Sequence, residues 1–81
     1  MPKVLRDLSG SDLVKLFIKE GFYVVRQTGS HIRLESSGHD FSITIPNHDP
    51  LKIGTLNAIL LEISGYLGKT KSQLLNHWFQ S

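Results

Sequence analysis

Two stretches in which apolar and polar residues alternate constrain the fold of this chain most. They are HIRLES, residues 31–36, and FSITIP, residues 41–46, with the turn-forming residues SGHD between them. A period of two places apolar side chains on one face of a strand and polar side chains on the other. The sequence therefore predicts two adjacent antiparallel strands with one buried face and one open face. The side chains expected on the buried face are Ile32, Leu34, Phe41, Ile43 and Ile45.

A third strand is expected just before this pair. FYVVRQ, residues 22–27, is rich in the aromatic and β-branched residues that favour strands. The residues TGS that follow predict a turn, with Gly29 at the position that tolerates positive φ. Pro46 ends the last strand because proline has no N–H to donate. Three short strands joined by tight turns predict an antiparallel meander.

A helix precedes the predicted sheet. Ser9 and Asp12 form a capping-box-like start, with Asp in place of the usual Glu or Gln. Apolar residues at helical spacing follow, and Gly21 stands where a helix ends in a left-handed residue. These signals predict an amphipathic helix over residues 10–20.

Two more helices are expected after the sheet. An apolar stripe at i, i+3, i+4 and i+7 predicts a helix that Thr55 caps and that runs to about Gly65. Thr70 and Gln73 then predict the capping box of a last helix. The residues of the stripe are Leu56, Ile59, Leu60 and Ile63, and those expected to face inward from the last helix are Leu74, Leu75, Trp78 and Phe79.

The predicted elements follow the order α-β-β-β-α, with an extra C-terminal helix. The apolar helix stripes need a surface to bury against, and the apolar sheet face supplies it. We therefore expect a two-layer α+β domain over residues 1–81, with helices on one face of a three-stranded antiparallel sheet. This arrangement resembles the double-stranded-RNA-binding-domain fold.

The open sheet face is expected to carry His31, Arg33, Ser42 and Thr44, which suit RNA cleavage without a metal. In that reaction the 2′-hydroxyl of the RNA attacks the neighbouring phosphate. The protein must remove one proton, supply another and stabilise charge on the phosphoryl oxygens. Histidine suits proton transfer at neutral pH, and the planar fork of arginine binds two oxygens at once.

The segment GSHIR, residues 29–33, offers all of these groups. Gly29 and Ser30 allow the backbone to approach a phosphate and offer N–H donors. His31 transfers protons, and Arg33 supplies charge on the same strand face. Arg26 lies across the hairpin and is able to join them. A histidine beside a turn is also commonly an ordinary solvated residue, so the residues alone leave both interpretations open.

The loop PNHDPLKIG is a second candidate for anion contact. His48 and Lys52 precede a predicted helix N-terminus, where free N–H groups bind anions. One interpretation makes His48 a second acid or base, or a phosphate contact. The other makes it a turn residue whose neighbours Asn47 and Asp49 satisfy local backbone groups.

Composition narrows the class of function. The chain has no cysteine, and its four histidines do not fall at metal-ligand spacing, so we expect no metal site and no cofactor. No apolar stretch approaches the roughly 18 residues that span a bilayer, and MPKVLRDLSG places no apolar run behind its charges. We therefore expect a cytoplasmic protein that binds no membrane. The net charge of +2 permits an anionic partner without requiring one.

Three segments, in this order, resemble the HicA-type toxins, small bacterial ribonucleases that cleave messenger RNA. LSGSDLVKLFIKEGF is similar to the first helix of that family, which ends in Gly-Phe. VVRQTGSHIRL is similar to its hairpin, with the Arg-Gln-x-Gly-Ser-His core, and ITIPNHDPLKIGTLNAIL to its Pro-x-His loop and Lys-x-Gly-Thr-Leu helix start. The resemblance covers about residues 4–67 and leaves the last helix outside.

The resemblance implies the toxin of a type II toxin–antitoxin system, a metal-independent endoribonuclease with His31 as its catalytic residue. It also implies a HicB-type antitoxin that covers the active face. Gly29 and Ser30 match the motif beside the histidine, and His48 matches the second histidine of the family. Arg33 and Lys52 rest on physical inference alone. The residues expected to hold RNA are Arg26, Gly29, Ser30, Arg33, His48 and Lys52.

Two other functions are compatible with the same residues. One is a non-catalytic RNA-binding module that uses the same open face. The other is an interaction protein whose open sheet edge pairs with a partner. The modest charge disfavours a module that depends on many phosphate contacts, and the histidine at position 31 favours the enzyme.

Overall fold

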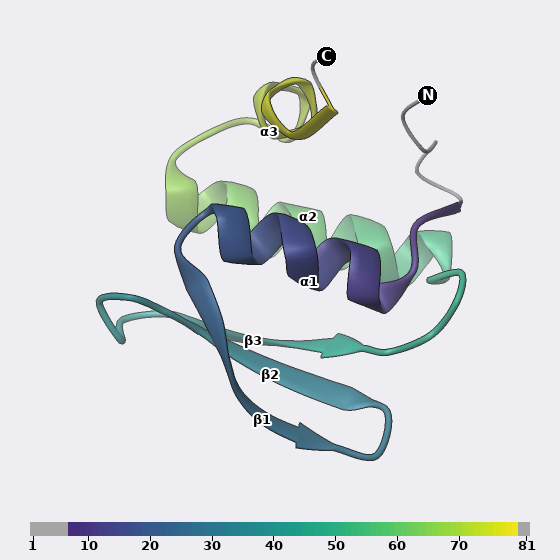
Figure 1. Ribbon diagram of the computed structural model, residues 1–81. Coiled ribbons are helices and arrows are strands. Elements are labelled where there is room, and N and C mark those ends of the chain that lie inside the picture. Colours follow the sequence, from purple (N-terminus) through teal and green to yellow (C-terminus); the bar gives the residue numbers. More distant parts are fainter. Residues whose placement is uncertain (1–6, 80–81) are drawn as a thin grey trace.

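A computed structural model describes residues 7–79, and Figure 1 shows a sheet, two helices side by side against it and a third helix beyond them. The sheet is antiparallel, with the strand order β1-β2-β3. The fold confirms the predicted α+β class, with helices on one face of the sheet and an extra C-terminal helix. The elements are α1 (Gly10–Lys19), β1 (Phe22–Thr28), β2 (His31–Ser36), β3 (Ser42–Pro46), α2 (Ile53–Leu67) and α3 (Lys71–Phe79).

Side-chain hydrogen bonds begin α1 where the sequence predicts. The Ser9 hydroxyl accepts from the Asp12 N–H at 3.0 Å, and the Asp12 carboxylate accepts from the Ser9 N–H at 3.1 Å. This capping box satisfies donors that the start of a helix otherwise leaves free. Gly21, with a φ of 94°, follows the helix. The helix expected over residues 10–20 is therefore confirmed to within one residue.

The boundaries of α2 differ from the prediction at both ends. Its N-cap is Lys52, whose side chain makes no capping hydrogen bond, so the prediction of Thr55 as the cap is wrong. The helix continues past Gly65 to Leu67, and Gly68 ends it with a φ of 69°. The start has no capping side chain to mark it, and the end has the left-handed glycine typical of helix C-termini, three residues after Gly65.

The extra helix, α3, lies on the side of α1 and α2 that faces away from the sheet (Figure 1). Thr70 and Gln73 form the predicted capping box, with hydrogen bonds of 3.1 and 2.9 Å. Trp78 donates its indole N–H to Glu20, the C-cap residue of α1, at 2.9 Å. Leu74 is fully buried. α3 is therefore part of the packed structure.

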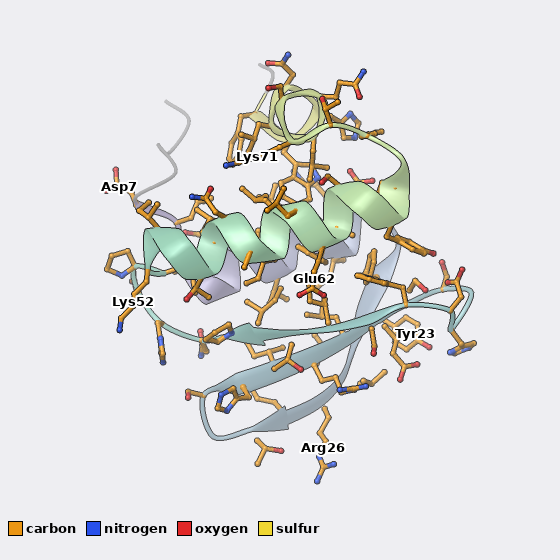
Figure 2. The ribbon with its side chains drawn as sticks, turned by 180° about the vertical axis from the view of Figure 1, so that it is seen from behind. Asp7, Tyr23, Arg26, Lys52, Glu62 and Lys71 are labelled. Carbon is orange, nitrogen blue, oxygen red and sulfur yellow. The ribbon has the colours of Figure 1, made fainter. Side chains whose placement is uncertain are left out.

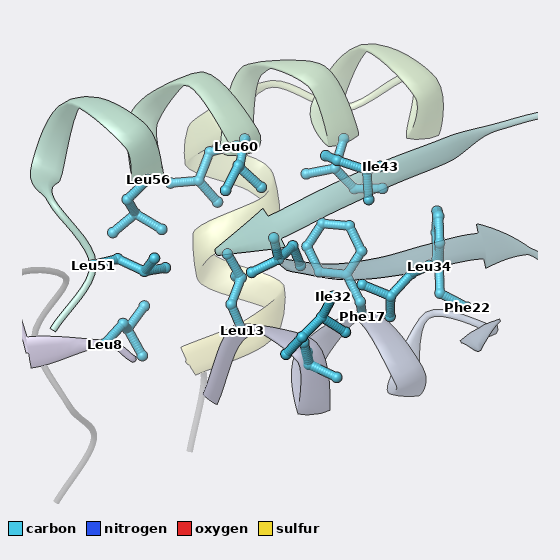
Figure 3. Close-up of a cluster of buried hydrophobic side chains, with 14 of the residues drawn as sticks. Leu8, Leu13, Phe17, Phe22, Ile32, Leu34, Ile43, Leu51, Leu56 and Leu60 are labelled. Atoms are coloured by element: carbon cyan, nitrogen blue, oxygen red, sulfur yellow. The ribbon is translucent and has the colours of Figure 1, made fainter. Parts of the chain in front are cut away.

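The core lies between the sheet and the pair α1 and α2 (Figure 3). Phe17 is fully buried and meets Phe22 edge-to-face, with 5.1 Å between the ring centroids, a favourable geometry for aromatic pairs. Phe41 is half-buried and packs against this core. The other strand side chains predicted to be buried are all buried, and they are Ile32, Leu34, Ile43 and Ile45.

The first strand, β1, leaves the cover of the helices after its first residue. Phe22 is buried, and the six residues after it are exposed, because the strand twists below and away from the helices (Figure 1). Its pairing with β2 shifts between Val24 and Arg26, so Val25 forms a β-bulge. An extra residue in one strand moves every following side chain to the other face. The bulge therefore decides which side chains of β1 lie on the open face.

Candidate functional site

Strand pairing arranges the side chains of the open face in three rows. Residues directly opposite each other share a face, with Cβ atoms about 4.5–5.5 Å apart, and successive rows lie two residues, or about 7 Å, apart. The rows are the His31 row (Thr28, His31, Pro46), the arginine row (Arg26, Arg33, Thr44) and the Tyr23 row (Tyr23, Glu35, Ser42).

The bulge at Val25 places Arg26 on the open face. Plain alternation from the buried Phe22 would put Arg26 on the side that faces the helices. The extra residue reverses this order, so Arg26 pairs with Arg33 and points away from the helices in Figure 2. The structure thus brings the two arginines together across the hairpin.

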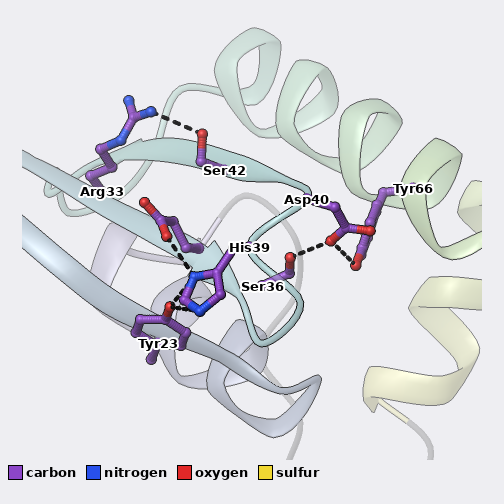
Figure 4. A network of polar contacts seen from close by, with 8 residues as sticks. Tyr23, Arg33, Ser36, His39, Asp40, Ser42 and Tyr66 are labelled. Atoms are coloured by element: carbon purple, nitrogen blue, oxygen red, sulfur yellow. Dashed lines mark hydrogen bonds and ion pairs between the residues drawn. The ribbon is translucent and has the colours of Figure 1, made fainter.

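Arg26 and Arg33 are like charges directly opposite each other, an arrangement that destabilises a sheet. Arg33 donates to the Ser42 hydroxyl at 2.9 Å (Figure 4). Arg26 makes no hydrogen bond or ion pair with any residue of 7–79. Guanidinium groups bind two oxygens of a phosphate or carboxylate at once. An anion bound between the two side chains would turn this repulsion into attraction.

His31 begins β2 beside the arginine row. Gly29 turns the chain just before it with a φ of 57°, and a Cβ at Gly29 would meet nothing within 4 Å. The His31 side chain is exposed, and among the described residues it has no hydrogen-bond partner. Its ring nitrogens are therefore available to a substrate that lies over the turn.

Backbone hydrogen bonds hold the loop of His48 against the turn of His31. The Asn47 N–H donates to the Ser30 carbonyl at 2.6 Å, and the Gly10 N–H donates to the His48 carbonyl at 2.8 Å. Pro46 pairs with His31 in the sheet, so the loop starts directly beside that histidine. The structure therefore brings His31, Ser30 and His48 to one end of the sheet.

α1 and this loop approach each other closely at Gly10. A Cβ at Gly10 would overlap the Pro46 carbonyl oxygen and would lie 2.8 Å from the Asn47 Cα. Any side chain there must displace the helix or the loop. Sequence reasoning missed this role because the approach joins segments that lie far apart along the chain.

Lys52 lies at the start of α2, three residues before the cap that the sequence predicts. It is the N-cap residue and is exposed, and Figure 2 shows it at the end of the molecule where the β1–β2 turn lies. The first turn of α2 contains no acidic residue. The Lys52 ammonium and the free N–H groups of this turn therefore contribute positive charge to the same end of the molecule.

The sequence does not predict a second polar cluster, which lies at the Tyr23 row. His39 Nδ1 lies 2.8 Å from the Tyr23 hydroxyl and 3.2 Å from Glu35 Oε1 (Figure 4). Alternation along β2 predicts that Glu35 lies on the open face, but His39 reaches it from the turn after the strand. His39 has a φ of 60°, and no local pattern indicates that conformation.

Within 7–79, no helix combines the length and the apolar character that crossing a membrane requires. In the same range, no three His, Asp or Glu side chains are grouped so that they could hold a metal ion.

The chain matches a known protein family. Residues 10–65 match the family described as "HicA toxin of bacterial toxin-antitoxin". The matched segment includes His31 and every residue that the sequence assigns to RNA contact, and it leaves α3 outside. No match was found among curated proteins or among solved structures.

Proposed function

Because the chain belongs to the HicA toxin family, we propose that this toxin is an endoribonuclease that cleaves messenger RNA without a metal, with His31 as its catalytic residue. The residues proposed to hold the RNA are Arg26, Gly29, Ser30, Arg33, His48 and Lys52.

The proposed reaction uses the nucleophile of the substrate itself. The 2′-hydroxyl loses its proton and attacks the adjacent phosphorus, the bond from phosphorus to the 5′-oxygen breaks, and the leaving oxygen takes up a proton. The products are a 2′,3′-cyclic phosphate and a 5′-hydroxyl. His31 transfers protons in this reaction, since its exposed imidazole stands beside the groups that would bind the phosphate.

The observation that carries this proposal is the arginine row beside His31. Arg26 and Arg33 face each other one row from the histidine, at a cost to the sheet that a bound phosphate offsets. Gly29 leaves the backbone of the turn accessible. His48 and Lys52 add polar and positive groups at the same end. The site thus joins proton transfer to stabilisation of phosphoryl charge.

The proposed neutralising partner is a HicB-type antitoxin that covers the open face. That face is the one the helices leave uncovered (Figure 1). An antitoxin that lies over the rows would exclude RNA from His31 and would pair its own acidic groups with Arg26 and Arg33. We place this pair in the cytoplasm, where messenger RNA is available, with no membrane, metal or cofactor as partner.

The test is cleavage of a defined RNA by the purified toxin in the presence of EDTA. We expect fragments with 5′-hydroxyl and 2′,3′-cyclic phosphate ends, and no cutting of the same sequence when every 2′-oxygen is methylated. RNA that is bound but stays intact would instead identify a non-catalytic binding module. Fragments with 5′-phosphate ends, or complete dependence on a divalent metal, would show that the proposed chemistry is wrong.

Removal of one arginine is expected to separate stability from RNA binding. Arg26→Ala relieves the repulsion with Arg33, so the free energy of unfolding stays level or rises by about 0.2–1 kcal/mol. Affinity for 2′-O-methyl RNA falls, and the log–log salt dependence of binding becomes shallower by roughly 1. Urea unfolding and fluorescence anisotropy over a salt series measure the two effects.

The matched control is Lys19→Ala, which removes an exposed positive charge from α1. It changes the net charge equally but lies away from the arginine row. If Lys19→Ala weakens binding as much as Arg26→Ala does, the effect belongs to overall charge and the arginine row is not a phosphate site.

A further inference from the structure

The cluster of Tyr23, Glu35 and His39 forms a surface on the open face that the proposed reaction does not use. The Tyr23 and His39 rings meet edge-to-face, with 5.9 Å between their centroids. His39 Nδ1 contacts both the Tyr23 hydroxyl and Glu35 Oε1. The side chain of His39 is 69% exposed and that of Glu35 is 32% exposed. The cluster therefore presents aromatic rings and a carboxylate to solvent.

Contacts with β2 and α2 hold the turn that carries His39. Asp40 Oδ1 accepts from the Ser36 hydroxyl at 2.7 Å and from the Tyr66 hydroxyl at 2.9 Å (Figure 4). These two hydrogen bonds hold the pKa of Asp40 below its usual value, and the bond from Ser36 has the larger effect. The Tyr66 ring also stacks on Phe41, with 4.7 Å between centroids. His39 is thus held over Tyr23 by bonds that join β2 and α2.

The backbone of His39 adds a second indication. Its φ of 60° lies in the left-handed region, which glycine enters more readily than a residue with a Cβ. Gly38 stands one position earlier. A side chain that is held in this unfavourable conformation, where a glycine would be easier to place, points to a use for the imidazole itself.

The chemistry of the cluster suits a nucleobase and opposes a phosphate. Tyrosine and histidine rings stack on unpaired bases. A carboxylate repels phosphate oxygens and accepts hydrogen bonds from the exocyclic amino groups of adenine, cytosine and guanine. Uracil has no amino group and offers only its single ring N–H, so it is the weakest partner. The arginine row lies between this cluster and His31. A strand of RNA across the face would thus place its phosphate on the arginines and a base on the rings.

We propose that Tyr23, His39 and Glu35 form a nucleobase subsite that selects adenine, cytosine or guanine over uracil, near the cleaved bond. This inference rests on the proposed ribonuclease function. Glu35 and His31 are four residues apart on one strand, or about 14 Å. The arginine row, which would hold the phosphate, lies between them, so the selected base lies about one or two nucleotides from the cleaved bond.

The test maps the cut sites of the toxin in an RNA pool of random sequence, by sequencing the new ends. We expect one position near the cut to be depleted of uracil by roughly fivefold to hundredfold, the range for one good base contact. Glu35→Gln, which replaces the acceptor by an amide, and Tyr23→Ala, which removes the stacking ring, are expected to reduce this depletion. Glu62→Gln, at an exposed glutamate of α2 (Figure 2), is the matched control.

The possible outcomes test the nucleobase subsite and the ribonuclease activity separately. Loss of uracil discrimination in Glu35→Gln and Tyr23→Ala, but not in Glu62→Gln, supports the subsite. If the toxin cuts RNA without base preference, or if Glu35→Gln leaves the preference unchanged, the proposed nucleobase subsite is wrong. The proposed ribonuclease activity is unaffected by that result. If the toxin cuts no RNA, the ribonuclease fails, and the subsite is then judged by binding. Equal affinity for 2′-O-methyl oligonucleotides of uridine and of cytidine overturns it.

Discussion

His31→Ala is expected to lower the rate of RNA cleavage by about 10²–10⁴-fold, the usual contribution of one positioned acid or base. The side chain is exposed at the start of β2 and is not part of the core. Its loss therefore removes proton transfer without unfolding the chain. The rate is measured on a defined RNA, and circular dichroism checks the fold. In a bacterial host, we expect induced expression of the parent to arrest growth and degrade messages, and His31→Ala to do neither.

The control for this prediction is His77→Ala. His77 is also an exposed histidine, but it lies on α3 and pairs with Glu20, away from the open face. Its replacement is expected to leave cleavage close to the parent rate. If a folded His31→Ala variant cuts RNA as fast as the parent, or arrests growth equally, His31 is not the catalytic residue.

Gly10→Ala is expected to lose both stability and cleavage, although it lies on α1. Its Cβ would overlap the Pro46 carbonyl, and overpacking of this kind costs about 1–3 kcal/mol of folding free energy. The loop must move, and it carries His48 and begins beside His31. A displacement of about 1 Å in a catalytic geometry lowers rates on the order of 10²-fold. Urea unfolding and cleavage kinetics measure the two losses.

A second glycine supplies the matched control. Gly65 lies inside α2, and a Cβ there would meet nothing within 4 Å, so Gly65→Ala is expected to stabilise the chain by up to about 1 kcal/mol. If Gly10 positions the loop, the double variant recovers part of the lost stability but none of the lost cleavage. Recovery of the full cleavage rate in the double variant would show that Gly10→Ala acts through stability alone.

The parts of the fold that the sequence predicts are those with local causes. Ser9 and Asp12 lie three residues apart and cap α1 with no help from distant segments. The same holds for Thr70 and Gln73 at α3. The alternation in β2 and β3 predicts their buried faces, because a period of two is set within each strand. These patterns determine the fold class.

The parts of the fold that the sequence does not predict depend on contacts between distant segments. The bulge at Val25 arises from pairing with β2, so its effect on Arg26 has no signal within β1. The start of α2 at Ile53 has no capping side chain, so no local signal marks it. His39 reaches the Tyr23 row through a backbone conformation that hydrogen bonds to Asp40 stabilise. The second cluster of the open face therefore emerges only in three dimensions.

The bulge at Val25 is also expected to reduce aggregation through the edge of the sheet. β1 is an outer strand of the sheet, and its residues after Phe22 are exposed. A flat, unbroken outer strand offers its free N–H and C=O groups as a template on which other chains stack into fibres. The extra residue breaks that template in mid-strand, and the charge of Arg26 stands beside the break. The bulge that turns Arg26 to the open face is thus also expected to protect the chain from aggregation.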